Sequence, residues 1–237
     1  MPTHIRASNG DVAPNVLLPG DPDRAQYIAE TFFDGPERYT DYRRMEGYTG
    51  TYRGLRVSVQ ATGMGCPSAA IMVEELITLG ARNLLRIGTC GTIQPSIELG
   101  DLIVVTGACA LNGLTTALVG VEGFAPVANH ELVSAAESAA RVKAMRRHLG
   151  VVATMDLFYD PRLELVENLR KYGVLALEME ASAVLTLGSR PGLRAGCLLT
   201  VSDLIASKTR ATPQAIRAGV DDMVEVALGA LLSLPSD

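Results

Sequence analysis

Short runs of Val, Ile, Leu and Ala recur along the whole chain and are separated by more polar segments. Most of these runs are almost continuously apolar, which is typical of strands in a sheet that is covered on both faces. The predicted strands are Val16–Leu18, Leu55–Ala61, Leu84–Ile87, Leu102–Thr106, Val151–Thr154, Val174–Leu177 and Cys197–Val201.

Segments with apolar residues at helical spacing lie between these strands. The first follows Asp21, which can cap a helix that begins at Pro22. The other predicted helices are Ser68–Leu79, Asn129–Met145, Leu163–Tyr172, Ala181–Leu187 and Pro213–Leu232. The alternation predicts an α/β fold with a mixed central sheet flanked by helices. Because the 237 residues contain no repeat and no convincing linker, we expect residues 1–237 to form a single domain.

Composition excludes some classes of function. The net charge is −5, from 21 basic and 26 acidic residues, and the chain has no Trp and only 5% aromatic residues. A nucleic-acid-binding surface needs a basic face and usually stacking rings, so we expect no nucleic-acid partner. An anionic substrate would have to be held by local arginines against the overall field.

Targeting and metal-binding signals are also missing from the sequence. The segment Met1–Ala13 has no apolar core of a signal peptide, and Val224–Leu234 is too short to span a membrane. The three histidines have no metal-ligand spacing, and the four cysteines have no CxxC spacing. We therefore expect a cytoplasmic protein with reduced thiols, no metal and no membrane contact.

Arg86 begins the most informative motif, Arg-Ile-Gly-Thr-Cys-Gly, which ends one of the apolar runs. An arginine in such a run is costly unless an anionic group meets it. We expect the glycines to turn the backbone at the strand's end and present N–H groups, with Thr89 adding a hydroxyl. Two interpretations stay open: a phosphate site, or a tight turn whose arginine pairs with a nearby carboxylate.

A second motif, Pro-Gly-Asp-Pro-Asp-Arg, shifts the balance towards a phosphate site. Gly20 precedes a helix N-terminus, where anions bind well, and Arg24 lies in the first turn of that helix. An early arginine opposes the helix dipole, so it requires a carboxylate neighbour or an anionic ligand. The alternative here is an ion pair with Asp21 or Asp23.

Acidic residues follow two other predicted strands, at the edge where α/β sites assemble. Ser202 and Asp203 follow one, and Asp203 is either a cap or turn residue or a catalytic acid. If the other strand continues, Glu178 and Glu180 share one face, where two carboxylates can bind the vicinal hydroxyls of a sugar. The rings of Phe158-Tyr159 either pack in the core, the usual outcome, or stack on a flat ligand.

These motifs, in this order, resemble those of the bacterial hexameric purine nucleoside phosphorylases of the nucleoside phosphorylase-I family. The similarity extends from His4 to the last predicted helix. It is carried by Gly20-Asp21-Pro22 with Arg24, Tyr48-Thr49-Gly50, Thr62-Gly63-Met64-Gly65, Arg86–Gly91, Asp156–Tyr159, Glu178–Ala181 and Val201–Asp203. The resemblance implies a three-layer phosphorylase/hydrolase-like fold and phosphate-dependent, reversible cleavage of purine nucleosides to base and pentose 1-phosphate.

The resemblance also implies a role for each matching residue. Phosphate binding falls to Gly20, Arg24, Arg86 and Thr89, with Arg43 lent by a neighbouring subunit. Nucleoside binding falls to Met64, Cys90, Gly91, Phe158, Glu178, Met179, Glu180 and Ser202, with His4 from the neighbour at the ribose 5′-hydroxyl. Asp203 is implied to be the acid that protonates N7 of the purine. The implied assembly is a homohexamer, a trimer of dimers with shared sites; no cofactor is implied, and phosphate is a co-substrate.

The chain departs from the family at one catalytic position. The family has an arginine on the last helix that pairs with the acid, but ungapped alignment from Asp203 places Ile216 there and Arg217 one residue later. One residue is about 100° around a helix, so Arg217 reaches Asp203 only after a local shift, and Arg210 is another candidate. If Asp203 has no such partner, we expect adenosine to be preferred over inosine or guanosine.

Three alternative functions stay open at this point. A uridine phosphorylase would carry an inserted loop with a Gln/Arg pair, which we do not find after Pro161. A nucleosidase would use water and would need no arginine cluster. A nucleoside-binding protein that has lost catalysis is the third, because of the displaced arginine.

Overall fold

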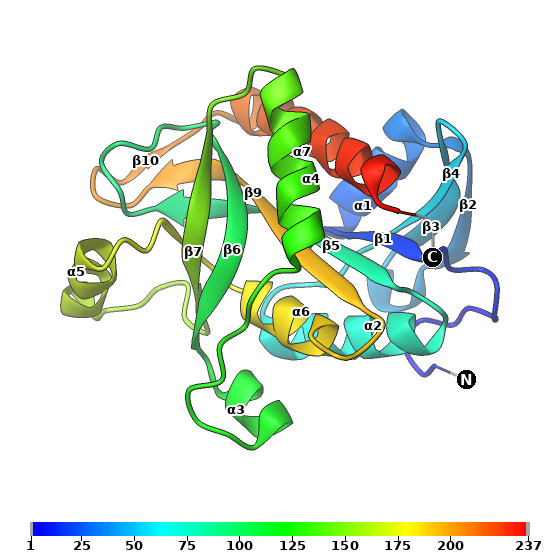
Figure 1. Cartoon of the computed structure of the whole chain (residues 1–237), viewed down its shortest axis with the longest axis horizontal. Helices are drawn as coiled ribbons and strands as arrows, with labels where there is room; N and C mark the ends of the chain where they lie inside the picture. The colour runs from blue at the N-terminus through cyan, green and yellow to red at the C-terminus, as the bar shows by residue number, and fades with distance from the viewer. Residues whose placement is uncertain (1, 236–237) are drawn as a thin grey trace.

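The computed structural model describes residues 2–235, whose strands form one ten-stranded mixed sheet. The strand order is β10-β9-β6-β7-β8-β5-β1-β4-β3-β2 (Figure 1). The strands are β1 (Asn15–Leu18), β2 (Asp34–Thr40), β3 (Gly47–Tyr52), β4 (Leu55–Gln60), β5 (Asn83–Thr92), β6 (Leu102–Leu111), β7 (Arg147–Met155), β8 (Ala176–Glu178), β9 (Arg194–Leu204) and β10 (Thr209–Arg210).

The described helices lie between or after the strands, and all but the third lie where the apolar pattern predicts them. They are α1 (Pro22–Phe32), α2 (Cys66–Thr78), α3 (Gly113–Val119), α4 (His130–Val142), α5 (Leu163–Lys171), α6 (Ala181–Gly188) and α7 (Pro213–Ser233), with the 3-10 turn η1 (Tyr42–Arg44). Asp21 caps α1 as predicted, since its side chain accepts from the backbone N–H of Asp23 at 2.9 Å. None of the described helices is long and apolar enough to cross a bilayer.

The sheet closes on itself around β5. This strand pairs with β1, β8 and β9, and β9 pairs in turn with β6. The strands β5, β8, β7, β6 and β9 therefore form a closed ring, and β1, β4, β3 and β2 extend from it. Closure places the C-terminal half of β5 between β8 and β9, which carry the acidic motifs.

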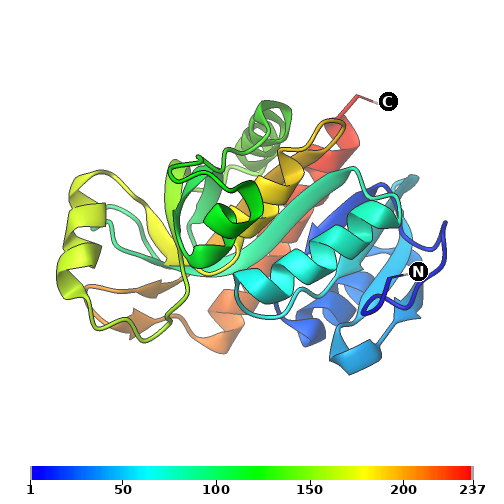
Figure 2. The same cartoon turned by 90° about the horizontal axis from the view of Figure 1, so that it is seen from below.

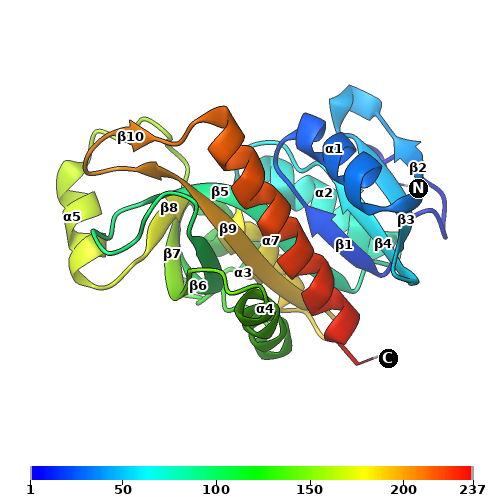
Figure 3. The ribbon, with the colours of Figure 1, turned by 90° about the horizontal axis from the view of Figure 1, so that it is seen from above.

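Two groups of helices cover the two faces of the sheet. Seen from below, α2 and α6 lie side by side against it (Figure 2), and from above α7 and α1 cross the opposite face (Figure 3). Strand residues alternate between these layers: Leu84 packs in the α2/α6 core, whereas Leu85 and Ile87 pack in the α1/α4/α7 core. Arg86 has the same parity as Leu84, so its side chain extends towards the N-terminus of α6.

Candidate active site

Arg86 lies inside β5 rather than at its end, which corrects the predicted strand-end turn. The strand continues through the motif to Thr92. Gly88 does not turn the chain; it makes room, because a Cβ at that position would lie 2.9 Å from Nη2 of Arg86. The motif is therefore a strand that accommodates a buried guanidinium beside a residue without a side chain.

Two carboxylates hold this guanidinium. Arg86 Nε donates to Glu178 Oε2 at 3.0 Å, and Nη2 contacts Glu180 Oε2 at 2.6 Å. All three side chains are almost fully buried. Burial alone would lower the pKa of Arg86, but the charges of Glu180 and Glu178 outweigh it and raise that pKa. The arginine is therefore a fixed cation. The predicted pairing with a nearby carboxylate is confirmed, and the structure shows two such carboxylates, Glu178 and Glu180.

The two glutamates reach Arg86 because the chain bends into α6. Strand β8 ends at Glu178, so continued strand alternation, which the sequence analysis had to assume, does not occur. Instead Glu178 accepts from the backbone N–H groups of Glu180 and Ala181 at 2.9 and 2.8 Å. Glu180 Oε1 accepts from the N–H of Gly65. The second carboxylate thus ties the Gly63–Gly65 loop to the guanidinium.

Gly20 lies against the same loop, and Arg24 follows it in the first turn of α1. A Cβ at Gly20 would lie 3.1 Å from the carbonyl oxygen of Gly63, which is tighter than most Cβ contacts, so glycine suits this close approach. Among residues 2–235, the Arg24 side chain makes no hydrogen bond or ion pair, so the ion pair with Asp21 or Asp23 is not formed. Burial lowers the pKa of Arg24, Asp21 raises it, and the charge of Arg86 lowers it further. The positive charge of Arg86 thus acts on the guanidinium of Arg24.

The end of β5 brings the phosphate motif to the predicted acid. A bulge between Cys90 and Gly91 shifts the register so that Gly91 pairs with Asp203 of β9, while Thr89 pairs with Thr200. Burial raises the pKa of the Cys90 thiol, which lies in the strand interior. Closure of the sheet, and not sequence proximity, therefore places Asp203 beside the Arg86 motif.

Asp203 has two hydrogen-bond partners. Ser202 Oγ donates to its Oδ2 at 2.6 Å, and Arg210 Nη1 donates to its Oδ1 at 3.3 Å. Arg210 is the residue directly opposite Asp203 in the β9–β10 pair. Of the two arginines that the sequence offered as partners of the acid, the structure pairs Asp203 with Arg210.

Arg217 lies elsewhere, which corrects its assignment beside the acid. Its guanidinium stacks on the Tyr27 ring of α1 at 3.5 Å. The Tyr27 hydroxyl donates to Asp221 at 2.9 Å, so the ring is fixed between α1 and α7. The one-residue shift explains this, because Ile216 packs against the core and Arg217 points towards α1.

Three further side chains of the predicted motifs are exposed to solvent. Phe158 and Tyr159 are 68% and 90% exposed, with ring centroids 5.0 Å apart, and Met64 is 85% exposed. The core packing that is usual for such rings does not occur. These side chains are free to contact a ligand or another chain.

His4 and Arg43 do not join the other candidate residues. His4 Nδ1 lies 2.9 Å from Glu75 Oε1 on α2, and Arg43 is exposed in η1 with a left-handed φ of 56°. Within residues 2–235, neither forms a hydrogen bond or ion pair with Arg24, Arg86 or Asp203. Their predicted action on a neighbouring subunit is compatible with these positions and stays a prediction.

Thr154 and Gly65 support the two glutamates, although the sequence motifs assigned no role to either residue. The Thr154 hydroxyl donates to Glu178 and accepts from the N–H of Ser182 at 3.0 Å. A polar residue at the end of an apolar run was the available signal, as it was for Ser202.

No group of three or more His, Cys, Asp or Glu side chains suited to a metal ion occurs in the described part of the chain.

Comparisons with known proteins cover nearly the whole chain. The family model of the phosphorylase superfamily matches residues 14–234. "Purine nucleoside phosphorylase DeoD-type" proteins of Bacillus cereus, Bacillus thuringiensis and Bacillus mycoides are each 43% identical over 233 residues. These alignments cover 98% of this chain and 99% of each relative.

Proposed function

The chain belongs to the phosphorylase superfamily, and on that premise we propose that it cleaves purine nucleosides with phosphate in purine salvage. The products are the free purine and ribose or deoxyribose 1-phosphate. Relatives that carry the name of this activity align over nearly the whole chain at 43% identity. The free thiols of Cys66, Cys90, Cys109 and Cys197 suit the reducing cytoplasm.

The observation that carries the proposal is the pair of arginines Arg24 and Arg86. The charge of Arg86 lowers the pKa of Arg24, and the Arg24 side chain forms no ion pair among the described residues. A phosphate dianion between them would relieve this repulsion through charge-assisted, bidentate hydrogen bonds. Gly20 at the start of α1 and Thr89 on β5 would add backbone and hydroxyl donors. A water nucleophile, as in a nucleosidase, gives no reason for this cluster.

The chemistry requires stabilisation of two charges. A phosphate oxygen forms a bond to C1′ while the C1′–N9 bond breaks and its electron pair moves into the purine. The phosphate dianion stabilises the oxocarbenium character of the ribose, which Glu180 and Met179 would orient. Asp203 donates its proton to N7, which raises the rate by a factor of about 10² to 10⁴. Phosphate supplies the nucleophile, so no organic cofactor takes part in this scheme.

Arg210 is the cation that we assign to the carboxylate left on Asp203. It already donates to Oδ1, whereas Arg217 is held by Tyr27. Because Asp203 has this partner, the reason given by the sequence for a preference for adenosine no longer applies. The base and sugar pocket would be lined by Ser202, Cys90, Gly91, Phe158 and Glu178, with Met64 beneath the ribose.

The assembly that we propose is a homohexamer of three dimers with shared active sites. Its support is the position of His4 and Arg43, which form no hydrogen bond or ion pair with Arg24, Arg86 or Asp203 in the described part of one chain. A second copy would bring them to the ribose 5′-hydroxyl and to the phosphate.

The test is a substrate panel with and without phosphate. Inosine, guanosine, adenosine and uridine are incubated with the enzyme, and the release of free base is followed. We expect release from purine nucleosides only when phosphate is present, little release from uridine, and a large loss in the Asp203→Asn variant. Equal rates with and without phosphate would instead indicate a nucleosidase.

A further inference from the structure

The turn that carries Arg43 has an unfavourable backbone conformation. Arg43 and Arg44 are consecutive residues with left-handed φ angles of 56° and 62°. Side-chain-bearing residues avoid this region, and such conformations persist only where the surroundings determine them. The turn therefore needs contacts that hold it, and these contacts decide where the Arg43 guanidinium lies.

Both ends of the turn are fixed by side chains of the sheet. On one side, Arg38 Nη2 of β2 forms an ion pair with Asp41 at 3.1 Å. On the other, the buried amide of Gln60 in β4 donates to the carbonyl oxygens of Met45 and Glu46 at 3.0 and 3.4 Å. These contacts fix the backbone on each side of Arg43, but they do not reach its side chain.

The tip of the turn is covered by an arginine from the N-terminal segment. The Arg6 guanidinium lies 3.5 Å from the centroid of the Tyr42 ring, and that of Arg43 lies 5.6 Å from the same centroid. A hydrogen bond from Arg43, followed by the charge of Arg6, lowers the pKa of the Tyr42 hydroxyl. The three side chains thus form one stack, Arg6–Tyr42–Arg43.

The segment that supplies Arg6 is itself firmly anchored. Glu75 of α2 accepts from the backbone N–H groups of Thr3, His4 and Ile5, and Ile5 is fully buried. Figure 2 shows the N-terminus beside α2, as these contacts require. His4 and Arg6 lie in the same anchored segment, and Arg6 contacts the Tyr42 ring beside Arg43. The segment and the stack therefore connect His4 with Arg43, the two residues that are expected to act on a neighbouring subunit.

We propose that Arg6 and Tyr42 are positioning residues that hold Arg43 in the orientation in which it binds the phosphate of the neighbouring active site. The proposal rests on the proposed function, in which Arg43 is a phosphate ligand in trans. It extends that function to two residues that line no part of the site. Substitution of Arg6 or Tyr42 keeps the Arg43 side chain itself, but the turn is then free to adopt other conformations that misplace it.

The experiment measures the KM for phosphate and the KM for nucleoside separately in variants of the full-length enzyme. We expect Arg43→Ala to raise the phosphate KM by about tenfold, the effect of losing a charge-assisted phosphate contact. Arg6→Ala and Tyr42→Leu should each raise it by about fivefold, with the nucleoside KM changed by less than about twofold. Arg6→Lys, which keeps the cation over the ring, should recover part of the loss.

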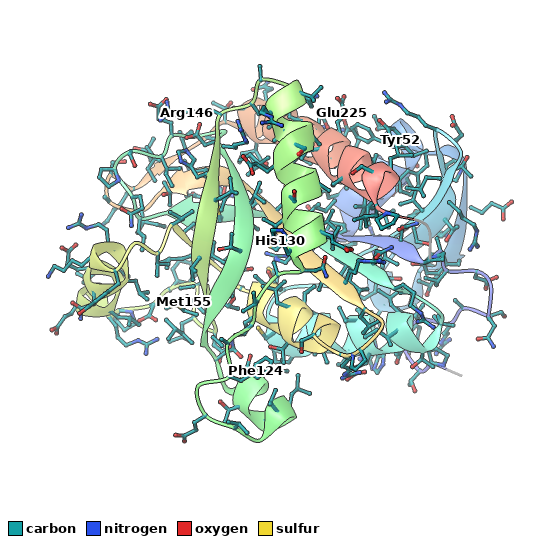
Figure 4. The ribbon with its side chains drawn as sticks, viewed as in Figure 1. Tyr52, Phe124, His130, Arg146, Met155 and Glu225 are labelled. Atoms are coloured by element: carbon teal, nitrogen blue, oxygen red, sulfur yellow. The ribbon has the colours of Figure 1, made fainter. Side chains whose placement is uncertain are left out.

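The double variant Arg6→Ala/Arg43→Ala separates positioning from direct binding. Its phosphate KM should equal that of Arg43→Ala, because Arg6 acts only through Arg43. Arg53→Ala is the matched control. Arg53 is exposed like Arg43, its backbone φ is also left-handed, and its guanidinium lies 5.1 Å from the centroid of the Tyr52 ring, which is labelled in Figure 4. We expect no change in either KM for this control.

Two outcomes would overturn the inference. One is an unchanged phosphate KM in both Arg6→Ala and Tyr42→Leu, and the other is a double variant whose defect is the product of the single ones. If Arg43→Ala itself leaves the phosphate KM unchanged, the role of Arg43 in the proposed function fails, whatever the other variants show.

Discussion

Replacing Glu178 with Gln removes one of the two charges that neutralise Arg86 while keeping the size of the side chain. The carboxylate has no exposed side-chain surface and accepts from Arg86 Nε at 3.0 Å. It also accepts from the backbone N–H groups of Glu180 and Ala181 and from the Thr154 hydroxyl. A glutamine oxygen can keep the backbone bonds, so the main loss is the negative charge beside a buried guanidinium.

The size of the effect follows from burial. Removing one partner of a buried ion pair typically costs about 3–5 kcal/mol, because the remaining charge is left uncompensated. Arg86 keeps Glu180 at 2.6 Å, so we expect a smaller decrease in the free energy of unfolding, about 2–3 kcal/mol. For a chain of this length, each kcal/mol shifts the Tm by about 2–4 °C, which predicts a decrease of about 4–12 °C.

The assay is thermal unfolding at one fixed protein concentration, since subunit assembly makes the Tm depend on concentration. Glu167→Gln is the matched control, because it breaks a bidentate pair with Arg170 that is 40–45% exposed. An exposed pair within a helix contributes about 0.3–0.5 kcal/mol, so the Tm of this control should fall by less than about 2 °C. If Glu178→Gln behaves like this control, Arg86 does not depend on Glu178 and the reasoning about the buried pair is wrong.

Three further predictions concern the acid, a thiol and the N-terminal anchor. Arg210→Ala should lower kcat/KM by more than tenfold and Arg217→Ala by less than about tenfold, or about 1.4 kcal/mol in the barrier; steady-state kinetics would refute this if Arg217→Ala lost several hundredfold. Burial raises the pKa of Cys66 to about 11, so a thiol reagent at pH 8 should label Cys66 only after unfolding. Burial raises the pKa of Glu75, but hydrogen bonds from the backbone and from the His4 side chain outweigh it and lower that pKa, so the contribution of Glu75 to stability is present above about pH 4.5 and is lost as the pH falls through the lowered value. The Tm difference between wild type and Glu75→Gln should therefore narrow on acidification, and a constant difference from pH 7 to pH 3 would contradict it.

The apolar runs predicted the buried strands and the long helices, because both faces of the central sheet are covered. The pattern missed β2 and β3, which lie at the outer antiparallel edge, where β2 is mostly exposed and polar. It also missed α3, which is short and has a single buried residue. Apolar periodicity reports burial, so elements at the surface leave a weak signal.

The candidate site was predicted as a set of residue types and not as an arrangement. Arg86, Glu178 and Glu180 were each singled out, but their mutual contact depends on the bend after Glu178 and on the space at Gly88. Arg210 reaches Asp203 through a short antiparallel pair that has no apolar signal. Contacts across a closed sheet depend on register, which one sequence does not reveal.

The central claim, that phosphate and not water attacks the nucleoside, is tested most directly with fully ¹⁸O-labelled phosphate. A purine nucleoside is incubated with the enzyme and the labelled phosphate, and the sugar product is analysed by mass spectrometry. Attack by phosphate at C1′ predicts pentose 1-phosphate that retains all of the label, including the oxygen bonded to C1′. Free unlabelled pentose as the product would contradict the account.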